Sequence, residues 1–208
     1  MIRIDHVLLA TTDLDHGSGQ LWRGYGLRSA PGGRHLAWGT ANLIIPVGEQ
    51  YLELVAVIDP ELAAASPLGR AVLAGADRER ITPIGVCLAA PDLDQISQRL
   101  GSPKENGARE LADGSEIRWT TVGLPRAFAA ERLPFYIKWD ALARHPSTGP
   151  VEHRIAPREI AEVEVGGPES ILAHHLAGAV PGIRPVGGAP GLRSVTLRLA
   201  DGGELQIP

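Results

Sequence analysis

The segments HVLLATTDLD (His6–Asp15) and GVCLAAPDLD (Gly85–Asp94) are nearly the same sequence. The offset between them is constant, because 85 minus 6 and 94 minus 15 both give 79. A fixed offset over such a stretch indicates an internal duplication. We therefore expect two structurally related modules in one chain, and we ask what each module is and which side chains it presents.

Each copy opens a strand–helix–strand–strand–strand (βαβββ) pattern. In the first copy an apolar run over 2–10 predicts a strand, a helix closed by Gly26 follows, and β-rich runs complete the pattern over 35–59. In the second copy the dipeptide Asp113-Gly114 predicts a hairpin, and LPFYIKWD over 133–140 predicts a final strand. A strand, a helix and a hairpin then recur once more in a shorter third copy that lacks the middle strands.

We predict an α+β fold in which the tandem βαβββ modules form a cupped mixed β-sheet, with a third partial module beside it. The predicted units are a first module (1–59), a helical spacer (60–80), a second module (81–140), a surface connection (141–158) and a partial βαββ module (159–208).

The composition excludes several classes of protein. Apolar residues make up 44% of the 208 residues and charged residues 21%, with a net charge of -4, which gives no basic surface for nucleic acid. No apolar run of about 18 residues could span a membrane, and the N-terminus is a strand pattern rather than a signal peptide, so we expect a cytoplasmic protein. The segment Gly17-Ser18-Gly19 matches neither a nucleophile-elbow nor a dinucleotide motif, so we expect no nucleotide cofactor.

Two polar residues stand on otherwise apolar strand faces. Alternation puts Ile4, His6 and Leu8 on one face of the first strand, and puts Tyr51 and Glu53 together on the last strand of the same module. A carboxylate on such a face costs free energy unless it is paired, hydrogen-bonded or bound to a metal. An imidazole nitrogen and a carboxylate oxygen suit zinc, iron, manganese or nickel better than calcium.

Tandem βαβββ modules with an IDH opening resemble the vicinal oxygen chelate superfamily, which includes glyoxalase I, extradiol dioxygenases and bleomycin-resistance proteins. The chain most resembles its glyoxalase-like domain family. The resemblance covers residues 2–140 and rests on His35 with GTAN (39–42), YLEL (51–54), the hairpin Asp113-Gly114 and PFYIKW (134–139). It implies a divalent metal on the concave face, held by the first and last strands of each module, with His6 and Glu53 at two of the ligand positions.

The second module departs from this pattern. Gly85 stands where the first module has His6, and the last strand presents Phe135, Ile137 and Trp139 on one face, with no carboxylate or imidazole on either. The pattern therefore supplies two ligands where a catalytic metal needs about three. Glu162, at twice the 79-residue period from His6, is a candidate from the third copy; the alternative is an exposed strand residue.

Six further residues are predicted to bind a ligand, most of them aromatic residues on the strands of the expected cup. An aromatic wall suits a hydrophobic or aromatic ligand, although core packing explains part of it, and the amide among them can orient a ligand or bind turn backbone. These residues are Trp38, Asn42, Trp119, Phe135, Ile137 and Trp139. Arg118 and Lys138 are the cations on these strands, with surface ion pairs as their default role.

The predicted function is a glyoxalase-like small-molecule enzyme of the lyase, isomerase or dioxygenase type, with His6 and Glu53 as catalytic residues. Either a divalent metal polarises vicinal oxygens, or Glu53 abstracts a proton without a metal. The alternative is a protein that sequesters an apolar or aromatic small molecule without chemistry, as drug-resistance members of the superfamily do. A small molecule is the expected partner, and a homo-oligomer is compatible with the sequence.

Overall fold

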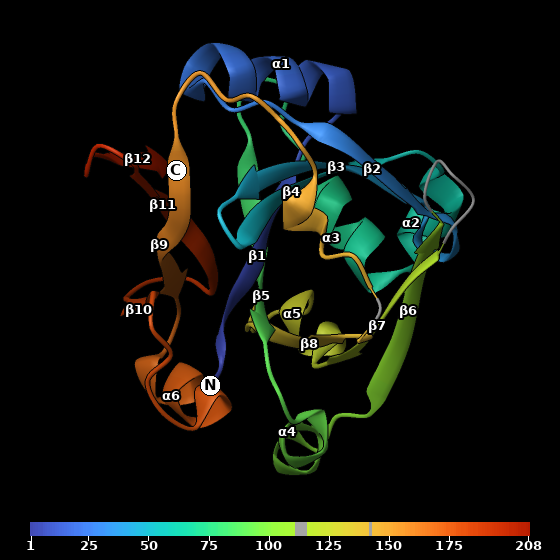
Figure 1. Cartoon of the computed structure of the whole chain (residues 1–208). Coiled ribbons are helices and arrows are strands. Elements are labelled where there is room, and N and C mark those ends of the chain that lie inside the picture. The colour runs from blue at the N-terminus through green and yellow to red at the C-terminus, as the bar shows by residue number, and fades with distance from the viewer. Residues whose placement is uncertain (111–115, 142) are drawn as a thin grey trace.

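The computed structural model describes residues 1–110, 116–141 and 143–208, and it contains one large and one small β-sheet (Figure 1). The predicted hairpin turn at Asp113-Gly114 lies outside the described residues. Among the described residues, no helix has the length and apolar character needed to cross a membrane.

Both modules have the predicted order of elements. The first consists of β1 (Arg3–Ala10), α1 (Leu14–Tyr25), β2 (Ala30–His35), a short 3-10 turn η1 (Leu36–Trp38), β3 (Thr40–Val47) and β4 (Gln50–Val57). The second consists of β5 (Thr82–Ala89), α4 (Leu93–Leu100), β6 (Lys104–Glu110), β7 (Glu116–Val122), α5 (Leu124–Ala127) and β8 (Phe135–Trp139). The helices α2 (Pro60–Ala65) and α3 (Pro67–Gly75) lie between the modules.

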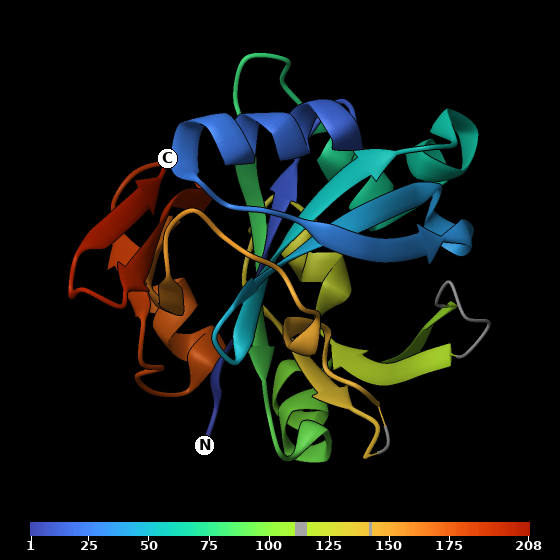
Figure 2. The same ribbon diagram turned by 45° about the horizontal axis from the view of Figure 1, so that its top comes forward.

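The large sheet has the strand order β2-β3-β4-β1-β5-β8-β7-β6. In each module the first strand lies parallel to the last, and the two modules meet where β1 pairs antiparallel with β5. The modules curve around a common interior (Figure 2), and the two edge strands approach each other, because the backbone of Gly33 on β2 lies against the side chain of Arg109 on β6. The α+β prediction with a cupped mixed sheet is confirmed.

Strand β2 occupies a segment, APGGRH, that alternation did not mark as a strand. The sequence pattern suggested that a strand starts at His35, whereas residues Leu36–Trp38 form the 3-10 turn and β2 ends at His35. Glycine and proline weaken a strand pattern, and they are tolerated here because β2 is an edge strand whose pairing with β3 shifts register between Pro31 and Arg34.

Two apolar cores lie on opposite faces of the large sheet. The outer core includes Val7, Leu9 and Leu54 and is covered by α1, α4 and the small sheet. The inner core includes Leu8 and Val55 and is closed by the spacer helix α3 and by α5. Strand parity therefore decides which residues reach the concave interior.

One residue breaks the predicted parity of the first strand. The pairing of β1 with β5 has an irregularity between Ile4 and His6, and Ile4 belongs to the outer core with Val7. The expectation that Ile4 shares a face with His6 and Leu8 is therefore wrong. A bulge adds one residue to one strand, so side chains on its two sides change face.

The C-terminal segment forms its own sheet rather than a shortened copy of the module. It contains β9 (Pro157–Gly166), α6 (Glu169–Leu176), β10 (Ile183–Val186), β11 (Gly191–Leu199) and β12 (Glu204–Ile207), in the strand order β10-β9-β11-β12. Here the first strand pairs with the second and third strands rather than with the last, and β10 was not expected. Its apolar face packs into the outer core (Figure 1), which explains why its strands show the same alternation.

The connection between the second module and the small sheet is partly tied down. It contains the 3-10 turn η2 (Pro146–Thr148), which lies against β3 and β4. His153 binds the carbonyl oxygen of Pro46 through Nε2 at 2.8 Å and accepts from the N–H of Arg28 at 3.0 Å. The predicted surface connection is thus held along the first module.

Candidate functional site

A pocket with about 490 Å³ of empty space, part of it open to solvent, lies on the concave side of the large sheet. All eight residues predicted for a site line this pocket: His6, Trp38, Asn42, Glu53, Trp119, Phe135, Ile137 and Trp139. They come from both modules, so the duplication brings them together although they are spread over more than half of the chain.

Glu53 lies at the centre of the polar part of the pocket, where only 7% of the residue is exposed. The Nδ2 atom of Asn42 donates to its Oε1 atom at 2.5 Å. The Nε2 atom of His6 lies 3.5 Å from Oε2, and the Nε2 atom of His35 lies 3.8 Å from Oε1. A buried carboxylate is thus held by one amide and flanked by two imidazoles.

The orientation of Asn42 follows from its other contacts. Its Oδ1 atom accepts the N–H of Gly33 at 2.7 Å and a longer contact from Nη1 of Arg109 at 3.4 Å. Because Oδ1 is occupied by donors, Nδ2 must be the atom that faces Glu53. Asn42 therefore keeps the carboxylate in place rather than binding turn backbone alone.

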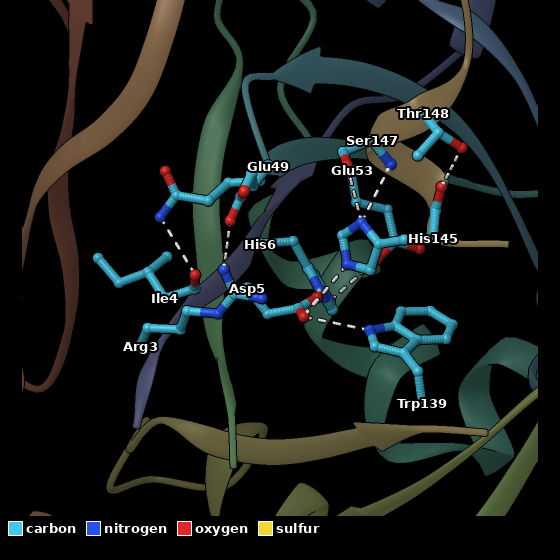
Figure 3. A network of polar contacts seen from close by, with 11 residues as sticks. Arg3, Ile4, Asp5, His6, Glu49, Glu53, Trp139, His145, Ser147 and Thr148 are labelled. Atoms are coloured by element: carbon cyan, nitrogen blue, oxygen red, sulfur yellow. Dashed lines mark hydrogen bonds and ion pairs between the residues drawn. The ribbon is translucent and has the colours of Figure 1, made fainter. Parts of the chain in front are cut away.

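Asp5 holds the far side of His6 (Figure 3). The Oδ1 atom of Asp5 is 2.7 Å from Nδ1 of His6, while its Oδ2 atom accepts Nε1–H of Trp139 at 3.1 Å and lies 3.3 Å from Nε2 of His145. Burial favours the neutral acid, but the hydrogen bonds from His145 and His6 outweigh it and hold the pKa of Asp5 well below its usual range. Asp5 is thus an anion, and it binds a protonated Nδ1 of His6.

Two buried groups beside Glu53, His35 and Tyr51, are uncharged at neutral pH. Burial lowers the pKa of His35, and this outweighs the opposite effect of the Glu53 charge. Burial and the Glu53 charge raise the pKa of Tyr51 well above its usual value, and the Tyr51 ring stacks on that of His6 with centroids 4.5 Å apart. Glu53 therefore has a neutral imidazole and a neutral phenol near it.

The register shows which residue of the second module replaces Glu53. Leu8 pairs with Glu53 across β1 and β4, and Cys87 pairs with Phe135 across β5 and β8. Leu8 and Cys87 are 79 residues apart (87 minus 8), which is the repeat offset. Phe135 therefore occupies the position that corresponds to Glu53.

The second-module position that corresponds to His6 also lacks a side chain that could bind a metal. It is Gly85, which pairs directly with Leu8. A β-carbon at Gly85 would lie 3.2 Å from Cε1 of Phe128, so the ring of Phe128 covers the place where a second-module ligand would point. The donor set that the superfamily resemblance implies is therefore half replaced by apolar groups.

A cluster of three potential metal ligands does exist in the described part of the chain: Asp5, His6 and Cys87, whose donor atoms lie within 4.8 Å of one another. Without a metal, its donor atoms are engaged by protein groups or protonated. Both oxygens of Asp5 already accept hydrogen bonds, and burial, with the charges of Asp5 and Glu53, raises the pKa of the Cys87 thiol well above its usual value. Metals bind thiolates rather than thiols. Of the four ligand positions of the superfamily pattern, the pocket keeps His6 and Glu53, while Gly85 and Phe135 stand at the other two.

Arg109 on β6 is the cation of the pocket, and only 7% of the residue is exposed. The two cations considered from the sequence are elsewhere: Arg118 is exposed and forms an ion pair with Glu116, and Lys138 is exposed. The side chains of the strand before the predicted hairpin, β6, were not assigned to the pocket from the sequence. No local sequence pattern predicts Arg109 as a pocket residue, because its side chain reaches the interior only through the approach of β6 to β2.

Glu162 of the small sheet does not reach the pocket. Its Oε1 atom lies 2.9 Å from Nε of Arg184 on the neighbouring strand β10, and its side chain is partly exposed. Glu162 is therefore not a ligand in this pocket, because the small sheet packs on the outer face of the large sheet, against β3, β4 and β5.

Besides Arg109, three polar residues of the site were missed from the sequence: Asp5, His35 and His145. The bulge near Ile4 brings Asp5 to His6, and His145 arrives from the connection, so neither follows from alternation. A signal for His35 was available, since it precedes GTAN in the segment that carried the resemblance. Its position at the end of β2, facing Glu53, required the tertiary structure.

Two duplicated modules that share a cupped sheet, with the pocket on its concave face, define the vicinal oxygen chelate fold. A family model described as a glyoxalase-like domain matches residues 4–180. The chain belongs to the glyoxalase-like domain family. The comparison with curated proteins gave no match.

Solved structures show the same fold at low sequence identity. A hypothetical protein from Staphylococcus aureus has a TM-score of 0.77 and 15% identity, with 100% of this chain and 99% of that chain covered. A methylmalonyl-CoA epimerase in complex with methylmalonyl-CoA and NH4+ has a TM-score of 0.50 and 16% identity, with 69% and 98% covered. At these identities the likeness shows the fold alone.

Proposed function

We propose that this protein is a small-molecule enzyme that moves a proton at a carbon next to a carbonyl group, with Glu53 as the base. The observation that carries the proposal is the arrangement at Glu53, a buried carboxylate held by Asn42 and flanked by His6 and His35 in a pocket with aromatic walls. Burial removes water from the carboxylate, and a base without competing water is effective in taking a proton from carbon.

His6 can accept the proton that Glu53 takes. The hydrogen bond to Asp5 favours the tautomer that carries hydrogen on Nδ1, so Nε2 has a free lone pair directed toward Glu53 Oε2 at 3.5 Å. Asp5 then stabilises the imidazolium that forms, as a carboxylate does behind a catalytic histidine. Return of a proton to another position of the substrate gives an isomerisation, and loss of a neighbouring group gives a lyase reaction.

No step of this mechanism passes through a metal. Gly85 and Phe135 stand at two of the four positions that the superfamily pattern uses, and this leaves His6 and Glu53 as the remaining pair. The dioxygenase alternative depends on a redox-active metal with about three protein ligands, and His6, His35 and Glu53 are the side chains that would hold one. The proton-transfer proposal requires no such group.

The test is exchange of substrate hydrogen with solvent. Candidate 2-oxo and 2-hydroxy carbonyl compounds are incubated with the protein in D2O, and NMR follows deuterium at the carbon next to the carbonyl. We expect Glu53→Gln, which keeps an oxygen for Asn42, to slow exchange by about a hundredfold to ten-thousandfold. Glu49→Gln is the matched control, because Glu49 is exposed and binds Arg3 on the surface.

A second candidate function is sequestration of an apolar or aromatic molecule. The aromatic wall favours it, since Trp38, Trp119, Phe135 and Trp139 all face the pocket. Tight binding without deuterium incorporation into any bound compound would support sequestration and contradict the enzymatic proposal. Binding is measured by quenching of tryptophan fluorescence in a Trp22→Phe background, because Trp22 on α1 does not line the pocket.

The proposal includes a small molecule as partner and a cytoplasmic location, as the sequence suggested. The family membership supports the first, and the lack of a membrane-crossing helix among the described residues is compatible with the second.

A further inference from the structure

The guanidinium group of Arg109 is a buried cation that the proposed mechanism does not use. Its Nε atom is buried and has no hydrogen-bond partner among the described residues, and its Nη1 atom makes only the long contact to Asn42 at 3.4 Å. Glu53 is the carboxylate of the same pocket, and its ion-pair contacts among the described residues are with His6 and His35 rather than with Arg109. A buried charge with unsatisfied donors is costly unless something pairs with it.

The fold provides space for this side chain. A β-carbon at Gly33 would lie 2.5 Å from Cγ of Arg109, closer than real contacts allow, so the bare glycine lets the stem of Arg109 lie across β2. Asn42 is seated in the same way, because a β-carbon at Gly32 would collide with its side chain. Two adjacent glycines on an edge strand therefore admit the guanidinium group into a pocket with aromatic walls.

From this geometry we infer that the ligand of the pocket carries a carboxylate group, which Arg109 binds, on an apolar or aromatic body that packs against the tryptophan and phenylalanine walls. A planar guanidinium fork matches a carboxylate in two parallel hydrogen bonds. The inference rests on the proposed function only in placing the ligand in the same pocket as Glu53.

A carboxylate fits the charge of the pocket better than a phosphate. Among the described residues that line the pocket, Arg109 is the single arginine and lysine does not occur, and Glu53 lies in the same cavity. A phosphate dianion beside Glu53 would bring more negative charge than one guanidinium offsets, whereas a singly charged carboxylate is balanced by it. The proposed ligand class is therefore an apolar monocarboxylate.

The test compares three probes of similar shape: 3-phenylpropionate, its uncharged amide and phenyl phosphate. Each is titrated into the whole protein, with quenching of tryptophan fluorescence in the Trp22→Phe background as the readout. We expect the carboxylate to bind roughly tenfold or more tightly than the amide, and more tightly than the phosphate, with a preference that weakens as salt is added.

Three variants assign the preference to Arg109. Arg109→Gln should abolish the difference between the carboxylate and the amide, and Arg109→Lys should retain part of it because the charge remains without the fork. Arg118→Gln, on the neighbouring strand and exposed, should leave the preference unchanged. Thermal unfolding and the affinity for the amide show whether Arg109→Gln still forms the pocket; if it does not, Arg109→Lys decides.

Several outcomes would overturn the inference: equal affinity of the wild type for acid and amide, tighter binding of the phosphate, binding of neither acid nor amide at millimolar concentration, or a preference that survives in Arg109→Gln. These results are independent of turnover. A preference for the carboxylate without deuterium exchange would support the inference and contradict the proposed function. Deuterium exchange without this preference would support the proposed function and contradict the inference.

Discussion

Asp5 and His6 are neighbours in the sequence, and their side chains are joined by a hydrogen bond of 2.7 Å between Oδ1 and Nδ1. Adjacent residues of a regular strand point to opposite faces, so this contact depends on the irregularity in the pairing of β1 with β5. The same ring presents Nε2 to Glu53 (Figure 3). Asp5 therefore positions His6 for the base, and the bulge is a functional feature of the site.

The first prediction concerns Asp5→Asn. An asparagine amide can donate to Nδ1 and so favour the tautomer with hydrogen on Nε2, which removes the acceptor facing Glu53. We expect deuterium exchange to slow by about tenfold to a hundredfold, with ligand affinity nearly unchanged. Asp13→Asn, at the N-cap of α1, is the control. An exchange rate equal to that of the wild type would show that Asp5 does not position His6.

The second prediction is that Asp5 makes folding stability sensitive to acid. Its folded pKa is below the usual value of 3.8, so the unfolded chain binds more protons in acid and stability falls as pH falls. The contribution is fully present above about pH 4 and is lost toward the lower folded pKa, on the order of 2 kcal/mol. Urea unfolding between pH 5 and about pH 2 should show a steeper loss for the wild type than for Asp5→Asn. Parallel pH profiles would argue against the ionic role of Asp5.

The third prediction concerns the protonation of His35. Because burial lowers its folded pKa, the ring stays neutral as the pH drops below 6.5, and its burial costs stability once the unfolded histidine begins to bind a proton. The ring signals of His35 in NMR spectra, assigned by comparison with His35→Gln, should not titrate near pH 6.5. Titration of the His35 ring near pH 6.5 would contradict the prediction.

The fourth prediction is that removal of metal leaves activity intact. The mechanism uses Glu53, His6 and Asp5 alone, so deuterium exchange should be unchanged after chelator treatment and after addition of zinc, nickel, manganese or ferrous ion. The metal content of the purified protein should equal that of the double variant His6→Ala with Glu53→Ala. A stoichiometric metal in the wild type that the double variant lacks would instead establish a metal site at these two residues.

The fifth prediction tests how the small sheet is attached. His175 on α6 is buried, its Nε2 atom lies 2.6 Å from the carbonyl oxygen of Pro134, and its own carbonyl accepts the hydroxyl of Tyr136 at 3.1 Å. His175→Leu should lower the free energy of unfolding by about 1–3 kcal/mol, because leucine has no donor and the buried carbonyl of Pro134 loses its partner. His174→Leu, one residue away and exposed, should change it by less than about 0.5 kcal/mol. Equal effects of the two variants would show that the contact does not hold α6 to β8.

Much of the fold could be predicted from the sequence, because repeats and strand alternation are local patterns. The repeated segments that begin at His6 and Gly85 predicted two modules, and alternation along 51–58 put Tyr51 and Glu53 on one face, where the structure has them. The same alternation put Phe135, Ile137 and Trp139 together in the last strand, and all three line the pocket. Strand β2 could not be predicted, because its glycine-rich segment shows no alternation of apolar and polar residues. The pairing of the small sheet could not be predicted either, because strand order leaves no periodic pattern in the sequence.

The sequence by itself determined the duplication, the order of elements in both modules and the inward position of His6 and Glu53, because periodicity along a strand depends only on nearest neighbours in the chain. The tertiary structure decided the rest of the site. A bulge turned Asp5 toward His6, the approach of β2 and β6 placed Arg109 beside Asn42, and the connection carried His145 to Asp5. The bulge depends on the pairing of β1 with β5, and the other two contacts join segments that are far apart in the sequence, so no local pattern encodes them.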